Sequence, residues 1–193
     1  MNDGEVLLGF DARAAPRTLA PHWDESRRAL YLLRRDASSP LSVDRAVWPA
    51  AATAGGPANA LGLWDSPPQF RQAPAADGVV TIAISLAWSA LSDASRVLWE
   101  PRLSRLALPA DVAWRLLGYD VADLALISGL SNCGYRQDEA AALRAIWSSR
   151  LNDHHLFSAP RPAADFASLT DRRVVEHAPF FAYGLYQLAR REE

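Results

Sequence analysis

The sequence predicts an α+β fold in which a mixed or antiparallel sheet, from the N-terminal two thirds, packs against a C-terminal group of about three helices. Two observations support this prediction. Apolar runs of strand length occur mainly in the first two thirds, and helical periodicity is clearest in the last third. Since 50% of the 193 residues are apolar, a sizeable core can form. We therefore predict a single globular domain over residues 1–193, and we identify no internal repeat.

The N-terminal part begins with a strand-like run at residues 5–11. Residues 28–35 have an apolar middle between charged ends, which fits a second strand or a short helix. A long irregular connection rich in Pro, Gly and Ala follows at about 36–77. It carries Trp48 and Trp64, and large aromatic side chains usually fasten an irregular segment to the core.

The middle of the chain holds three further candidate elements. Residues 79–91 are apolar over about 13 positions, too few to span a membrane, and predict a buried strand leading into a turn or short helix. Residues 95–108 are strand-like in part, but Pro101 interrupts them. A helical turn is expected after Pro109, and Gly118 marks a break in the apolar segment that follows.

The clearest helical pattern covers residues 137–153. Its expected apolar stripe consists of Leu143, Ile146, Trp147 and Leu151, which recur at helical spacing. Two acidic residues in the first turn suit the positive end of the helix dipole.

Two more helices are predicted after this one. The first covers 161–173, where Pro162 fits the first turn. The second begins near Pro179, and Gly184 weakens it by about 1 kcal/mol relative to Ala unless another backbone packs there. The expected buried stripe of this last helix is formed by Phe181, Leu185 and Leu188.

Composition excludes several functions. The net charge of −2 gives no electrostatic basis for binding nucleic acid or an anionic membrane surface. All 20 basic residues are arginine, so no lysine serves as a Schiff-base former or in a phosphate loop. A single cysteine and no secretory leader favour a cytoplasmic bacterial protein, and we expect no cofactor.

Cys133, in the stretch "SNCGY", is the candidate nucleophile if the protein is an enzyme. It stands shortly before the helix predicted at 137–153, and a helix start lowers the pKa of a thiol. His177 or His154 is the candidate base. Candidate orienting groups are Asn132, Asp153 and Glu176. The competing interpretation, which we favour, makes Cys133 a small residue in a tight turn.

We predict no metal site, because adjacent histidines at 154–155 point in different directions and no ligand spacing is specific. Asp120 and Asp123, in "GYDVAD", are read as a turn or an exposed edge whose carboxylates are solvated or paired with arginine.

The favoured function is a non-enzymatic intracellular binding protein of a bacterium, of the immunity or accessory type, with another protein as its partner. Trp and Arg are enriched at binding hot spots, and Trp23, Trp48 and Trp64 lie outside confident regular elements. These three are the candidate partner-binding residues. The alternative is a small cysteine-dependent hydrolase or transferase that uses Cys133 with a histidine base. No oligomeric state is predicted.

Overall fold

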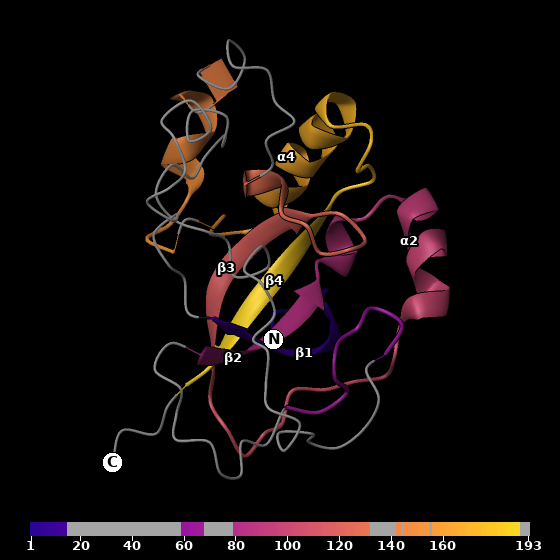
Figure 1. Ribbon diagram of the computed structural model, residues 1–193, viewed down its shortest axis with the longest axis vertical. Coiled ribbons are helices and arrows are strands. Elements are labelled where there is room, and N and C mark those ends of the chain that lie inside the picture. Colours follow the sequence, from indigo (N-terminus) through magenta and orange to yellow (C-terminus); the bar gives the residue numbers. More distant parts are fainter. Residues whose placement is uncertain (15–58, 68–78, 132–141, 144, 155, 190–193) are drawn as a thin grey trace.

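The computed structural model describes residues 1–14, 59–67, 79–131, 142–143, 145–154 and 156–189, and it confirms the α+β prediction (Figure 1). A four-stranded sheet has the order β1-β2-β4-β3, and every neighbouring pair is antiparallel. The strands are β1 Val6–Ala14, β2 Val79–Leu86, β3 Trp114–Ala122 and β4 Phe181–Leu188.

Two α-helices have defined bounds in the described residues: α2 Asp93–Trp99 and α4 Pro160–Arg173. Helical residues also occur at 142–143 and 145–147. The short 3-10 turns are η2 Trp88–Ala90, η3 Glu100–Arg102, η4 Gly129–Ser131 and η5 Ser148–Arg150. No helix in the described part of the chain is long and apolar enough to cross a membrane.

The two outer strands repeat the same local structure. β1 contains "LLGFD" and β3 contains "LLGYD", and each strand has a bulge just before its glycine. Gly9 and Gly118 have φ angles of 148° and 142°, which favour glycine. A Cβ at either position would lie 2.7 Å from the Cβ of a leucine in a neighbouring turn. The glycines therefore let a turn approach each outer strand closely.

The turns that meet these glycines are also repeated. In the Asn59 turn (59–64), the Asn59 side chain donates to the carbonyl of Leu8 over 2.9 Å, and its oxygen accepts two backbone N–H groups of the turn. In the Asn152 turn (152–157), Asn152 donates to the carbonyl of Leu117 over 2.7 Å and likewise accepts two backbone N–H groups. Each turn ends in a backbone bridge to the residue after the glycine.

The inner strands complete an approximate two-fold arrangement. Ile84 of β2 faces Leu185 of β4 across the centre of the sheet. On either side, Ser85 pairs with Gly184 and Ala83 pairs with Tyr186. We call β1 with β2 and the Asn59 turn one β unit, and β3 with β4 and the Asn152 turn the other. Exchanging the two β units maps the Ser85–Gly184 pair onto the Ala83–Tyr186 pair, so an approximate two-fold axis between β2 and β4 relates them. The expectation of no internal repeat is therefore wrong.

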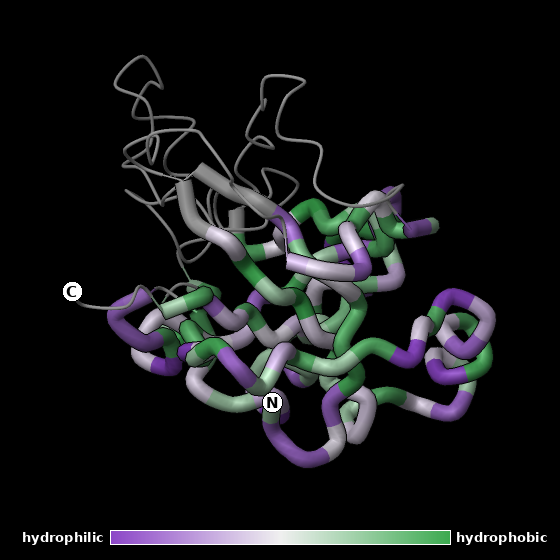
Figure 2. The backbone as a smooth tube through the Cα atoms, turned by 90° about the horizontal axis from the view of Figure 1, so that it is seen from below, coloured by the Kyte–Doolittle hydropathy of each residue, from purple (hydrophilic) through white to green (hydrophobic). Residues whose placement is uncertain are grey.

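The larger core cluster packs on the sheet and includes residues of α2 and α4, with Trp99, Phe157 and Phe166 fully buried within it. A smaller cluster contains Leu7 and Phe10. Figure 2 shows hydrophobic residues mostly in the middle of the described chain and hydrophilic ones mostly in the outer turns. Burial of this apolar surface is the main favourable contribution to folding.

The helix predicted to begin near Pro179 is wrong, because this segment is the central strand β4. Its first six residues are all buried, since the strand has a neighbour on each side and cover on both faces. A strand buried on both faces loses the polar–apolar alternation that identifies strands. Gly184 does accommodate a close neighbour, since a Cβ there would lie 2.5 Å from the Ser85 hydroxyl oxygen.

Two other local predictions need correction. Residues 95–108 were expected to be strand-like in part, but residues up to Trp99 belong to α2, whose N-cap Ser92 accepts a hydrogen bond from the N–H of Ser95.

The helix predicted at 161–173 is confirmed as α4. In the stripe expected nearby, Leu143, Trp147 and Leu151 pack on the core, but Ile146 is 55% exposed. Leu143, Trp147 and Leu151 are spaced four residues apart, and Ile146, three residues after Leu143, lies at the side of the stripe that they form.

Candidate functional site

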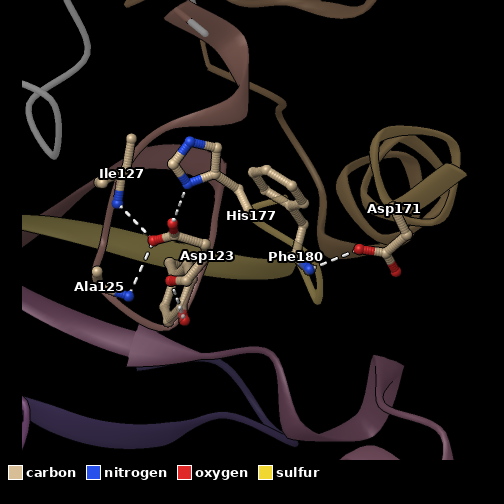
Figure 3. Close-up of polar contacts among 7 residues, drawn as sticks. Asp123, Ala125, Ile127, Asp171, His177 and Phe180 are labelled. Atoms are coloured by element: carbon tan, nitrogen blue, oxygen red, sulfur yellow. Dashed lines mark hydrogen bonds and ion pairs between the residues drawn. The ribbon is translucent and has the colours of Figure 1, made fainter. Parts of the chain in front are cut away.

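The loop between α4 and β4, residues 174–180, is fixed on two sides by aspartates from other elements (Figure 3). Asp123, just after β3, bonds His177. Asp171, in the last turns of α4, bonds the backbone N–H of Phe180. The loop also contains a cis peptide bond between Ala178 and Pro179. Two carboxylates thus hold the loop against the sheet and the helix.

Asp123 is positioned by the backbone around it. Its Oδ1 accepts the N–H groups of Ala125 and Ile127, each over 2.9 Å. Its carbonyl accepts the hydroxyl of the buried Tyr183 over 3.0 Å. These bonds leave Oδ2 aimed at the His177 ring, whose Nδ1 lies 3.2 Å away. The carboxylate is 8% exposed and therefore has little freedom to turn.

His177 has the geometry of an oriented imidazole. A carboxylate beside Nδ1 favours a proton on that nitrogen, so the neutral ring presents Nε2 as an acceptor. The side chain is 36% exposed, which leaves part of the ring open to solvent. This arrangement suits either a proton acceptor or a polar contact with another molecule.

Asp171 has a different environment. Its Oδ1 accepts the Phe180 N–H over 2.6 Å. Burial raises the pKa of this carboxyl above its ordinary value, while the Phe180 hydrogen bond and the charge of Arg172 act in the opposite direction. Asp171 and Phe180 also line a cleft of about 500 Å³ between α4 and the segment that follows β2.

Asp123 joins the turn after β3 to the 174–180 loop, and each of these two segments carries one exposed apolar side chain. Ile127 is 45% exposed, and its backbone N–H is bound by the same carboxylate as His177. Val175, two residues before His177, is 70% exposed. Together Ile127, Val175 and His177 form what we call the loop surface.

A second polar cluster, the Glu5 network, lies over the centre of the sheet. The Glu5 carboxylate accepts the hydroxyls of Tyr119, Tyr186 and Ser85, the last over 2.9 Å. Asn2 donates to the Tyr119 hydroxyl over 2.8 Å. Burial and the Glu5 contacts raise the pKa of Tyr119 to about 12, and they also raise that of Tyr186. Because the two tyrosines are buried, the network fixes the N-terminal segment to the sheet.

Several predicted site residues lie outside the described residues, namely Cys133, Asn132, Trp23 and Trp48. The candidate bases lie apart in the chain. His177 bonds Asp123, whereas His154 is exposed in the Asn152 turn. Trp64 is half-buried, and its backbone pairs with Phe10 at the β1 edge. Of the candidate orienting groups, Asp153 and Glu176 are exposed, and Asp123 takes the position beside His177.

The expected turn is present at Asp123, whose carbonyl accepts the N–H of Leu126. The expectation of exposed, solvated carboxylates at Asp120 and Asp123 is wrong, because both side chains are buried. Asp120 closes β3 by accepting the Ser128 hydroxyl over 2.7 Å. The sequence does carry a signal for Asp123. An aspartate directly after an apolar strand often accepts a hydrogen bond from the backbone two residues further on.

In the described residues no group of three or more His, Cys, Asp or Glu is placed to hold a metal ion. Comparison of the chain with family models, curated proteins and solved structures finds no match.

Proposed function

We propose that this chain is a non-enzymatic, cytoplasmic protein-binding protein of a bacterium, of the immunity or accessory type, and that the loop surface contacts its protein partner. The observation that carries the proposal is the joining of Ile127 and His177 through the buried Asp123 carboxylate, with the exposed Val175 two residues before His177. Apolar side chains presented on a rigid support lose little conformational entropy when they are covered.

The loop surface has the features of a small binding hot spot. Its apolar members are exposed, and a half-exposed imidazole beside them supplies a polar contact. It lies at the end of β3, whereas Trp64 lies beside β1 at the other edge of the sheet. The proposal therefore centres on different residues from the tryptophans, and Trp64 remains a candidate for a separate contact.

The test is capture of the partner by the tagged full-length chain from a lysate of the source organism, read by mass spectrometry. Val175→Asp is expected to reduce the captured amount at least about tenfold, because a buried charge at a hot spot is costly. Val97→Asp is the matched control, since Val97 on α2 is also 70% exposed. Equal capture by both variants would remove the loop surface from the proposal, and failure of the wild-type chain to capture any protein would contradict it.

The Asp123–His177 pair supports a second candidate, a cysteine-dependent hydrolase or transferase. A histidine oriented by a carboxylate accepts a proton from a nucleophile, here the Cys133 thiol. In this case iodoacetamide should label Cys133 rapidly near pH 7. His177→Gln should slow the labelling at least about tenfold, because the base is removed. His154→Gln is the control, and an equal slow rate in all three proteins would exclude this candidate.

A further inference from the structure

The cleft of about 500 Å³ between α4 and the segment after β2 combines polar walls with an apolar floor. Its volume lies in the range that holds small ligands. One wall is a single face of α4, where Arg161, Asp165, Ser168 and Asp171 recur every three or four residues. This face is opposite the buried face of the helix, which carries Phe166 and Thr170.

The facing wall is rich in hydroxyl groups. Ser89, Ser92 and Ser95 recur every third residue along η2 and the start of α2. Ser92 and Ser95 bond each other over 3.0 Å, which fixes their side chains. A hydroxyl has one donor and two acceptor sites, and Ser92 already accepts the N–H of Ser95, so the ligand N–H groups are accepted mainly by Ser89 and Ser95. The floor includes Phe180 and Phe181.

The charges of the cleft do not balance. Arg161 pairs with Asp165 over 3.2 Å at the exposed rim. Asp171 lies deeper, and among the described residues its only hydrogen bond is the one from the Phe180 N–H to Oδ1. Figure 3 shows Oδ2 pointing away from Phe180. Arg172 is the charged neighbour of Asp171, but it does not line the cleft. The cleft lining therefore holds two carboxylates, of Asp165 and Asp171, and one cation, Arg161.

We propose that this cleft binds a small organic cation, an alkylguanidinium or alkylammonium group, through the Asp171 carboxylate and the facing serine hydroxyls. The guanidinium or ammonium group donates several hydrogen bonds and carries the charge that offsets Asp171. The attached hydrocarbon chain lies on the floor beside Phe180. This site is separate from the loop surface, and the proposal does not depend on the protein-binding function. The cation comes either from a free metabolite or from an arginine side chain of a polypeptide.

The test is calorimetric titration of the full-length chain with N-butylguanidine and with its neutral isostere N-butylurea. Saturable binding of butylguanidine, at least tenfold tighter than butylurea, is expected. Acetyl-Gly-Arg-Gly-amide distinguishes the source: tighter binding than butylguanidine indicates a polypeptide, and binding of butylguanidine alone indicates a free cation. Equal affinity for butylurea, or no saturable binding of either cation, would overturn the proposal.

Variants locate the site. Asp171→Asn keeps an acceptor for the Phe180 N–H but removes the charge, and it should weaken butylguanidine binding at least tenfold. Asp111→Asn removes the same charge at an exposed turn outside the cleft and should leave the affinity within twofold. Ser168→Leu, at an exposed position of α4, fills the cleft and should abolish binding without disturbing the core. Loss of affinity in Asp111→Asn equal to that in Asp171→Asn, or full affinity in Ser168→Leu, would contradict the assignment.

Discussion

The two β units of this protein share their backbone devices and differ in what is attached to them. Each has a bulged outer strand, a glycine with a positive φ angle, and an asparagine turn bridged to the strand. Between β3 and β4, the Gly118 unit also carries Asp123, α4 and His177. His177, which bonds Asp123, belongs to the loop surface, and α4 forms one wall of the cleft. The repeated parts therefore build the sheet, and the parts described in only one unit hold the candidate sites.

A single hydroxyl marks the main chemical difference within the repeat. Phe10 and Tyr119 occupy equivalent positions, each bridged to the end of an asparagine turn. Only Tyr119 donates to Glu5, whereas Phe10 packs against Trp114 at a ring distance of 5.5 Å. Glu5 thus breaks the two-fold arrangement, because it binds the hydroxyl of Tyr119 and Phe10 has no hydroxyl at the equivalent position.

The largest effect is expected at the two glycines. Gly118→Ala would bring a Cβ within 2.8 Å of the Phe157 carbonyl oxygen, and Gly9→Ala within 2.9 Å of the Trp64 carbonyl oxygen. Each should lower the free energy of unfolding by about 3 kcal/mol or more, from backbone strain together with overlap. Urea denaturation followed by circular dichroism measures this loss. A variant with unchanged stability would show that its turn moves away freely.

The asparagines should have a smaller effect. Asn59→Ala and Asn152→Ala each remove three hydrogen bonds to backbone groups, and each should cost about 2 kcal/mol of unfolding free energy. Replacement by Asp keeps the acceptor and loses the donor, so the loss should be about half as large. Similar losses of unfolding free energy in both units would support the repeat. A loss in one unit alone would mean that the asparagine stabilises the turn only in that unit.

Exchange of the equivalent aromatic residues tests the asymmetry. Tyr119→Phe removes a donor from Glu5 and should cost about 1–2 kcal/mol. Phe10→Tyr adds a hydroxyl to a buried ring that packs in the smaller apolar cluster and should cost a similar amount. Thermal unfolding measures both. Stabilisation by Phe10→Tyr would mean that the first unit already holds a partner for that hydroxyl.

The smallest effect is a loss of stability at high pH. The pKa of Tyr119 is about 12 in the folded protein and about 10 when unfolded, so folding favours the protonated phenol. Its contribution is fully present below about pH 10 and is lost as the pH rises through about 12. Urea midpoints measured between pH 9 and about 11 should fall, and they should fall less in Tyr119→Phe. Identical slopes would contradict the role of this tyrosine.

The sequence reveals α4 because a helix with one buried face repeats its apolar residues at helical spacing. The order of strand-like and helix-like runs along the chain reveals the fold class. It conceals β4, because Phe181, Leu185 and Leu188 have helical spacing in a strand that is buried on both faces. The repeat is visible as "LLGFD" and "LLGYD", but the distance from Gly9 to Asn59 is longer than that from Gly118 to Asn152. A search for a fixed period misses such a pair.

The candidate site was harder to predict than the fold. His177 could be proposed as a base from its residue type, but its partner Asp123 lies 54 positions away in the chain. The meeting of the two depends on β3 and β4 being neighbours, and the sequence interpretation had assigned the β4 segment to a helix. Pairing across a sheet is a property of the topology, which local patterns do not encode.

Hydrogen exchange of the full-length chain, with and without the captured partner, tests the central claim most directly. We predict that partner binding slows amide exchange at residues 123–127 and 174–180. Exchange should not change at 59–64, the Asn59 turn, which has the Asn152 turn as its counterpart in the other unit. Protection confined to 59–64, with 123–127 and 174–180 unchanged, would contradict the account and place the partner on the β1 edge beside Trp64.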